Sequence, residues 1–174
     1  MKKILGVSII LSLVALNLSC KKDKITEFDI DYTSTLTIPS SSITVNVPAD
    51  FSSPEIPTDS KDKFTSEKTV QNLVDEIKLT KFDLSVANGN LNFLKSLSIY
   101  LKTSGLGDVL IASKTSIPQG VSALAMDLEN VNIKEYIFKD KIQFRVTVTI
   151  QTGLAATQQL KMDQTVHVKA KLVK

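Results

Sequence analysis

The 174-residue chain is poor in the residues that usually build disulfides, metal sites and sugar-binding platforms. It has one cysteine, one histidine, three tyrosines and no tryptophan. A single cysteine excludes a disulfide within the chain. One cysteine and one histidine are also too few for a typical zinc site. Carbohydrate-binding modules usually stack sugars on exposed aromatic side chains, which are scarce here. No Gly-x-Ser-x-Gly elbow is present to join His167 in a Ser-His-Asp arrangement.

Blocks of basic residues are also missing. The formal net charge is +3, from 21 basic and 18 acidic side chains. Lys2 and Lys3 lie in a hydrophobic N-terminal segment, and without them 19 basic side chains face 18 acidic ones, a net charge of +1. Because no basic stripe with interleaved aromatic residues remains, the sequence predicts no nucleic-acid partner.

The N-terminal segment has the layout of a secretory signal. Lys2 and Lys3 form a positive start, residues 4–16 are apolar, and Cys20 closes the segment. The apolar run is shorter than the ~20 residues that a transmembrane helix needs. Two other interpretations stay open, namely an uncleaved membrane anchor and a buried free cysteine in an N-terminal helix.

With its terminal cysteine, this segment resembles a bacterial lipoprotein signal peptide. The usual box has leucine three positions before the cysteine, whereas here Asn17 occupies that position and Leu16 precedes it. Such relaxed boxes resemble those of Bacteroidota-type Gram-negative bacteria. The resemblance implies that residues 1–19 are removed and that Cys20 carries a diacylglycerol and a further acyl chain such as palmitate. Several acyl chains together give stable membrane anchoring.

Residues 20–26 are expected to form the lipidated cysteine and a short tether. Lys21, Lys22, Asp23 and Lys24 are too polar to pack in a core. They resemble the charged export signals of some surface lipoproteins, and they equally suit a plain solvated spacer. No aspartate follows Cys20 directly, which favours the outer membrane over retention at the inner membrane.

Most of the remaining chain alternates apolar and polar residues, the pattern of half-buried strands. The alternation of apolar and polar residues shifts by one position near Lys81, which predicts a β-bulge. The Asn88-Gly89 sequence predicts a turn. The predicted strands cover residues 25–38, 43–47, 77–86, 124–128, 144–150 and 166–172, and residues 96–113 are predicted to form a hairpin.

Two short helices and two loops complete the prediction. Ser66 is a candidate cap for a helix over residues 67–75, and residues 131–138 are expected to form a helical turn. Residues 49–65 are rich in proline, serine and aspartate and are predicted to be a loop. Residues 152–163 are predicted to be the tip of a hairpin that joins the last two strands.

These elements predict an all-β fold over residues 27–174, namely an antiparallel Ig-like β-sandwich of about seven to nine strands with one or two short helices. An up-and-down barrel is the alternative. The stretches 94–118 and 128–137 (LKSLSIYLKTSGLGDVLIASKTSIP and LENVNIKEYI) resemble the Ig-like sandwiches of small Bacteroidota-type lipoproteins and, more faintly, the late-embryogenesis-abundant type 2 domain. The resemblance implies no catalytic motif.

No residue set in the chain predicts catalysis, cofactor binding or a metal site. His167 lies on the polar face of the last strand and is expected to be solvated. Asp29 and Asp31 share one strand face, and Asp59 and Asp62 share a loop, so they are candidate calcium ligands. The sequence lacks the Asp-x-Asp-x-Asp-Gly pattern, however, and we assign no metal. A two-carboxylate glycosidase needs no sequence motif, but the few aromatic residues argue against it.

Two function classes fit this sequence. The first, which we favour, is a lipid-anchored, non-catalytic binding or assembly module of the outer membrane, whose partner is an unknown envelope protein or surface ligand. It would use loops 49–65, 88–95 and 152–163, and exposure of Phe51, Ile56, Leu154 and Ala155 would support it. The second is a carrier of an apolar ligand such as a lipid between the sheets. A hydrolase ranks third.

Overall fold

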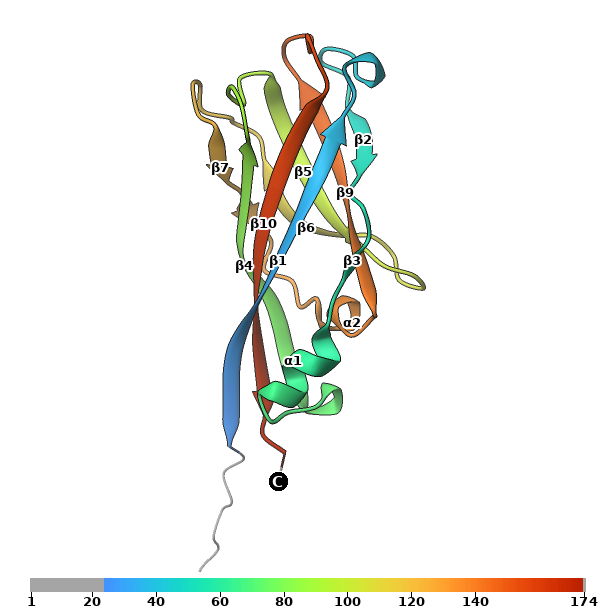
Figure 1. The fold of residues 1–174 in the computed structure, drawn as a ribbon, viewed down its shortest axis with the longest axis vertical. Helices are drawn as coiled ribbons and strands as arrows, with labels where there is room; N and C mark the ends of the chain where they lie inside the picture. The colour runs from blue at the N-terminus through green and yellow to red at the C-terminus, as the bar shows by residue number, and fades with distance from the viewer. Residues whose placement is uncertain (1–23, 174) are drawn as a thin grey trace, which may run out of the picture.

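The computed structural model describes residues 24–173, which form two antiparallel sheets packed face to face (Figure 1). The first sheet has the strand order β1-β10-β4-β7, and the second has the order β2-β9-β5-β6-β8, with β3 paired to β9. The strands of the first sheet are β1 (Ile25–Ile38), β10 (Gln158–Lys171), β4 (Val74–Val86) and β7 (Ala123–Ala125). Those of the second are β2 (Ala49–Ser52), β9 (Lys141–Ile150), β5 (Leu94–Lys102), β6 (Val109–Lys114), β8 (Asp127–Leu128) and β3 (Ile56–Pro57).

The predicted antiparallel β-sandwich with short helices is therefore confirmed. The described residues contain ten strands, whereas about seven to nine were predicted. Two of the ten, β3 and β8, have only two residues each. The helices are α1 (Ser60–Ser66) and α2 (Lys134–Ile137), with two 3-10 turns, η1 (Ser40–Ser42) and η2 (Gln71–Leu73). Helix α2 lies inside the predicted helical segment 131–138.

The first strand shows how the sequence pattern becomes a sheet face. β1 pairs with β10 along its whole length, from Ile25 opposite Lys171 to Ile38 opposite Gln158. From Ile30 onward its even-numbered side chains are buried and its odd-numbered ones exposed. Because successive side chains of a strand point to opposite faces, this alternation places one face in the core and one in water. The predicted bulge near Lys81 is also present, as a register shift between β4 and β10.

Aromatic and aliphatic side chains of both sheets fill the core. Phe82 of β4 and Phe144 of β9 meet edge to face, with ring centroids 5.7 Å apart, and so join the two sheets. At the end where the chain begins, Phe64 of α1 lies against Phe28 and Phe138 in two further edge contacts. Helix α1 thus closes this end of the sandwich.

The predicted helix over residues 67–75 is wrong, because the helix in this region ends where that one was expected to begin. Helix α1 closes in a Schellman motif, in which the Lys68 amide bonds to the Thr65 carbonyl and the Thr69 amide to the Phe64 carbonyl. Lys68 has the left-handed conformation that this motif requires (φ 56°). Of the apolar residues at helical spacing after it, Val70 precedes η2 in extended conformation, Leu73 ends η2 and Val74 begins β4.

The predicted strand over residues 43–47 and the predicted loop over residues 49–65 are also wrong. Asn46 has a positive φ of 60°, and the Val47 amide bonds back to the Thr44 carbonyl at 3.1 Å, so this segment turns. Asparagine tolerates this conformation better than most residues. The strand forms later, as β2, and the rest of the expected loop contains β3 and α1.

The last two long strands do not form the predicted hairpin. β9 belongs to the second sheet and β10 to the first, so the connection 151–157 crosses between the sheets. β10 already begins at Gln158, inside the expected hairpin tip. The predicted strand 124–128 likewise divides between the sheets as β7 and β8, on either side of buried Met126. The hairpin at residues 96–113 is confirmed by the pairing of β5 with β6.

Candidate functional site

The chain enters and leaves the sandwich at the same end. The Leu172 amide bonds to the Lys24 carbonyl at 2.9 Å, beside the start of β1 and the end of β10. Four connections lie at the opposite end: residues 39–48, 87–93, 115–122 and 151–157 (Figure 1). We call these four connections the loop end, and the end that contains Lys24 and Leu172 the base. Cys20 and the tether residues before Lys24 lie outside the described residues.

Asn92 holds three of the four connections of the loop end together. Its side-chain oxygen accepts the Gly120 amide at 2.6 Å, and its carbonyl accepts a hydrogen bond from the Gln151 side chain at 2.7 Å. The Leu91 amide adds a bond to the Val121 carbonyl at 2.8 Å. These bonds connect the turns of both sheets, so the loop end is a defined surface and not a set of independent loops.

The fourth connection brings apolar side chains to this surface. Val45 and Val47 are exposed, and Lys95 donates a hydrogen bond to the Asn46 side chain between them at 2.9 Å. Their alternation with polar residues predicted a half-buried strand, so nothing in the sequence indicated that these valines are exposed. Of the four residues whose exposure would support the binding module, only Ala155 is exposed; the others, Phe51, Ile56 and Leu154, pack against the core.

The predicted binding loops are only partly brought together. Residues 88–93 and 152–157 meet at the loop end, whereas residues 94–95 and 158–163 are strand residues. Residues 49–65 run down the side of the molecule as β2, β3 and α1 (Figure 1).

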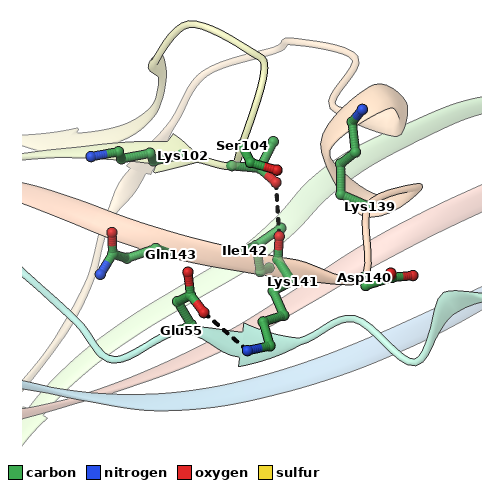
Figure 2. A pocket seen from close by; sticks show the side chains of 9 residues that line it. Glu55, Lys102, Ser104, Lys139, Asp140, Lys141, Ile142 and Gln143 are labelled. Carbon is green, nitrogen blue, oxygen red and sulfur yellow. Dashed lines mark hydrogen bonds and ion pairs between the residues drawn. The ribbon is translucent and has the colours of Figure 1, made fainter.

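A groove of about 550 Å³ lies between the end of β5, β3 and the start of β9 (Figure 2). The Lys141 ammonium group contacts the Glu55 carboxylate at 3.1 Å, and the Thr103 hydroxyl donates to the Lys141 carbonyl at 2.8 Å. Lys102 and Lys139 line the same groove, and every charged side chain in it is exposed. Binding sites for small ligands are usually enclosed, whereas this groove is open to solvent.

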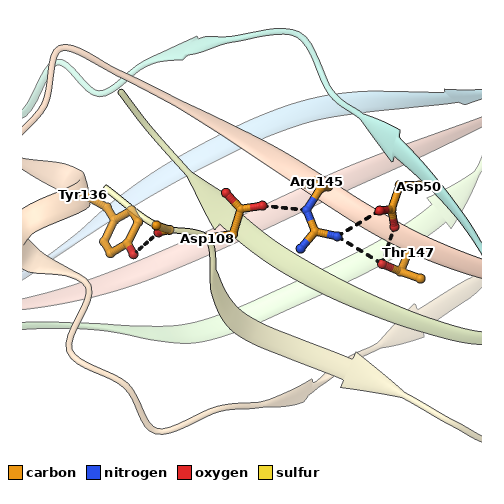
Figure 3. Close-up of polar contacts among 6 residues, drawn as sticks. Asp50, Asp108, Tyr136, Arg145 and Thr147 are labelled. Atoms are coloured by element: carbon orange, nitrogen blue, oxygen red, sulfur yellow. Dashed lines mark hydrogen bonds and ion pairs between the residues drawn. The ribbon is translucent and has the colours of Figure 1, made fainter. Parts of the chain in front are cut away.

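Arg145 is the centre of a polar cluster on the outer face of the second sheet (Figure 3). Its Nε contacts the Asp108 carboxylate at 2.6 Å and its Nη1 contacts Asp50 at 3.2 Å. The guanidinium carbon lies 4.0 Å from the centre of the Tyr100 ring. The hydrogen bond to Asp108 raises the pKa of Arg145, with a smaller contribution from Asp50.

This cluster fixes a loop. Asp108 belongs to the connection between β5 and β6, and the Tyr136 hydroxyl donates to the Gly107 carbonyl of the same connection (Figure 3). Arg145, paired with two carboxylates, therefore connects β9 to this loop and to β2.

His167 lies on the exposed face of the first sheet, as its strand position predicted. Its Nδ1 is 2.8 Å from the Asp29 carboxylate on β1, and its Nε2 is 3.9 Å from Glu27. Asp31 accepts a hydrogen bond from Thr165 at 2.7 Å. These cross-strand pairs stabilise the sheet in the usual way.

The candidate calcium ligands are separated in the structure. Asp29 and Asp31 lie on β1, whereas Asp59 and Asp62 lie at the start of α1. Within residues 24–173, no group of three or more histidine, cysteine, aspartate or glutamate side chains is placed to hold a metal ion. No helix in that range is long and apolar enough to cross a membrane.

Gln164 is a polar residue in the middle of the core. Only 1% of its surface is exposed, and neither polar atom of its side-chain amide has a hydrogen-bond partner in the described part of the chain. It lines a cavity of about 10 Å³, together with Tyr32, Phe144 and several aliphatic side chains. This cavity has room for about one water molecule, so it does not offer the space that an acyl chain would need.

Comparisons with known proteins add no family. No protein-family model matches the chain, and no curated protein matches it. Among solved structures, it is similar to one described as Desmodium yellow mottle tymovirus, with 8% identity, a TM-score of 0.28, and coverage of 100% of this chain and 97% of the other. It is also similar to the empty head of turnip yellow mosaic virus, with 11% identity, a TM-score of 0.29, and coverage of 99% and 93%. Scores this low support no inference about this chain.

Proposed function

We propose that the protein is a lipid-anchored lipoprotein of the bacterial outer membrane that acts as a non-catalytic binding or assembly module through its loop end. The observation that carries the proposal is the position of the two ends of the sandwich. Lys24, four residues after Cys20, lies at the base, and the loop end lies at the far end of β1. A strand of 14 residues spans about 45 Å.

This arrangement suits a module that presents a surface at a distance from its membrane. A lipid on Cys20 would hold the base near the bilayer and leave the loop end accessible to a partner. Exposed Val45 and Val47 supply apolar contact area there, and the hydrogen bonds of Asn92 keep the surface ordered. Binding surfaces usually combine such a rigid scaffold with loop residues.

The anchor and the partner surface are tested separately. For the anchor, cells are fed an alkyne-tagged fatty acid. The protein should incorporate the tag, and Cys20→Ser should abolish incorporation and leave the precursor uncleaved. Untagged wild-type protein would contradict the lipoprotein assignment.

For the surface, a photo-crosslinking amino acid is placed at position 47 and, as a control on the sheet face, at position 80, where Thr80 is also exposed. Position 47 should crosslink to one defined envelope partner in intact cells, and the double variant Val45→Ser/Val47→Ser should weaken a crosslink placed at position 155. Equal crosslinking at positions 47 and 80 would contradict a specific loop-end partner.

A further inference from the structure

Three exposed aliphatic residues lie at the base of the sandwich. Ile25, Val70 and Val173 have 55%, 44% and 52% of their surface exposed. The Val173 amide bonds to the Lys68 carbonyl at 2.8 Å, two residues before Val70, and Ile25 is paired with Lys171 in the ladder between β1 and β10. We call these three residues the base patch.

Half of the exposed large hydrophobic residues in the described part of the chain lie at the base. Apart from the base patch, the exposed large hydrophobic residues there are Val45 and Val47 at the loop end and Leu128 on β8. Single exposed aliphatic residues are ordinary, whereas several at one end of a molecule offer apolar area that contact with a membrane would cover. The patch is also held firmly, because the Thr69 hydroxyl donates to the Lys171 carbonyl at 2.6 Å.

The length of chain before the patch indicates what covers it. Four residues separate Ile25 from Cys20. An extended chain spans at most ~3.6 Å per residue, so Ile25 lies within about 18 Å of Cys20. If Cys20 carries its lipid, the base patch is therefore confined to the neighbourhood of the headgroups of the same bilayer.

Charged side chains of both signs surround the patch. Lys24, Lys68 and Lys171 lie beside it, and so do Glu27 and Glu67, so basic side chains exceed acidic ones by one. One basic side chain near an anionic surface contributes only about 1 kcal/mol of attraction, whereas aliphatic side chains at an interface contribute by burial of their apolar area.

We propose that the base patch inserts into the headgroup region of the bilayer that holds the lipid anchor. The sandwich then stands upright on the membrane, with its loop end directed away from it. The inference rests on the proposed lipidation of Cys20 and adds a second membrane contact, with a fixed orientation of the protein.

The experiment uses the fact that the chain has no cysteine other than Cys20. The mature lipidated protein is prepared with one introduced cysteine, at Ile25, Val70 or Val173 for the base patch and at Val45 or Leu128 as matched controls. Each is labelled with an environment-sensitive fluorophore and reconstituted into vesicles of phosphatidylethanolamine and phosphatidylglycerol. Intact mass establishes how many acyl chains Cys20 carries.

Labels at the base patch should shift their emission to shorter wavelength and be quenched by spin-labelled lipids, whereas labels at positions 45 and 128 should not. High salt should leave this difference unchanged. Val70→Asp should reduce the quenching of a label at position 173, and the matched change Val45→Asp should not.

The outcomes separate the two proposals. An unmodified Cys20 would overturn the lipoprotein assignment and this inference with it. Acylated Cys20 with equal quenching at positions 70 and 45 would overturn the inference alone. Crosslinking of position 70 between two copies of the chain, without lipid quenching, would also overturn it, because the patch would then be a protein interface.

Discussion

Arg145 and Asp108 link the outer face of β9 to the connection that leads into β6. The distance from Arg145 Nε to the Asp108 carboxylate is 2.6 Å, and both side chains are mostly shielded from water, with 25% and 29% of their surface exposed. Asp50 approaches the same guanidinium from β2 at 3.2 Å. One arginine thus connects a loop and an edge strand to the centre of the second sheet.

Replacing this arginine should loosen the loop and leave the fold intact. We expect Arg145→Met to lower the free energy of unfolding by about 1 kcal/mol, the sum expected for a partly shielded ion-pair network and a cation–π contact. Hydrogen exchange of residues 103–109 should accelerate more than that of the β9 core. Urea unfolding and hydrogen-exchange mass spectrometry would measure the two effects.

The matched control is Lys61→Met, which removes an ion pair with Asp140 whose side chains are 74% and 86% exposed. Such a pair contributes little, so a loss below about 0.5 kcal/mol is expected. If both variants lost the same stability, or if exchange in residues 103–109 were unchanged in Arg145→Met, the connecting role of Arg145 would be refuted.

Replacing Gln164 should not lower the stability, in contrast to replacing Arg145, because the buried Gln164 amide lacks a protein partner in the described residues. A buried amide without a hydrogen bond costs about 1–3 kcal/mol, and methionine has a similar volume without that cost. We therefore expect Gln164→Met to be as stable as the natural protein or more stable by about 1 kcal/mol, as measured by its urea midpoint.

The neighbouring core residue Val166 provides the comparison. Val166→Ala deletes apolar volume at a site that is 2% exposed and should cost about 2 kcal/mol. A loss of similar size in Gln164→Met would show that the amide has a partner of its own, such as a buried water, and would contradict the prediction.

The sequence predicted which faces of the strands are buried better than it predicted which strands are neighbours. Alternation reports only that a side chain points inward, and it is the same for two strands of a hairpin and for two strands on opposite sheets. For this reason β9 and β10 were recognised as strands but wrongly paired. Residues 43–47 show the same limit, because alternating apolar residues there form a turn around Asn46.

The candidate surfaces were even harder to predict from the sequence than the strand pairing, because they consist of segments that only three-dimensional contacts bring together. The loop end joins distant segments through single hydrogen bonds that leave no periodic signal, such as the bond from the Asn46 amide to the Ile150 carbonyl, 104 residues further along the chain. Val45 and Val47 were read as strand residues for the same reason. The base patch also joins the two ends of the described chain, Ile25 and Val173, which only the pairing of β1 with β10 brings together.

Lys68 offers a simple test of how α1 ends. Lys68 has a left-handed conformation, which costs a residue with a side chain about 1–2 kcal/mol relative to glycine. Glycine in turn loses more conformational entropy on folding, which costs about 0.5–1 kcal/mol. We therefore expect Lys68→Gly to raise the free energy of unfolding by about 0.5 kcal/mol, as measured by urea unfolding. Lys63→Gly, inside the same helix, should instead lower it by about 1 kcal/mol. Loss of stability in both variants would argue against the Schellman ending.

Tyr32 should make the unfolding free energy depend on alkaline pH. Its hydroxyl is buried and donates to the Thr58 carbonyl at 3.0 Å. Burial, together with the nearby charge of Asp59, raises the pKa of Tyr32 well above its ordinary value of 10.0. Above pH 10.0 this tyrosine ionises in the unfolded chain and stays neutral in the folded chain. The contribution of Tyr32 to the free energy of unfolding is therefore complete below pH 10 and decreases as the pH rises further.

Tyr32→Phe should accordingly be less stable than the natural protein at neutral pH, by about 1 kcal/mol for the lost hydrogen bond. The difference should narrow above about pH 10, because phenylalanine cannot ionise. Lysine side chains titrate in the same range, but they do so in both proteins and cancel in the comparison. Urea unfolding over this pH range measures the difference directly.

Thr58→Val is the control for Tyr32→Phe, since it removes the hydroxyl that donates to the Lys139 carbonyl while keeping Tyr32. Its loss of stability should stay constant across the same pH range, because threonine does not titrate. If the Tyr32→Phe curve ran parallel to that of the natural protein above pH 10, ionisation of Tyr32 would not be coupled to unfolding. The burial of its hydroxyl against Thr58 would then not control alkaline stability.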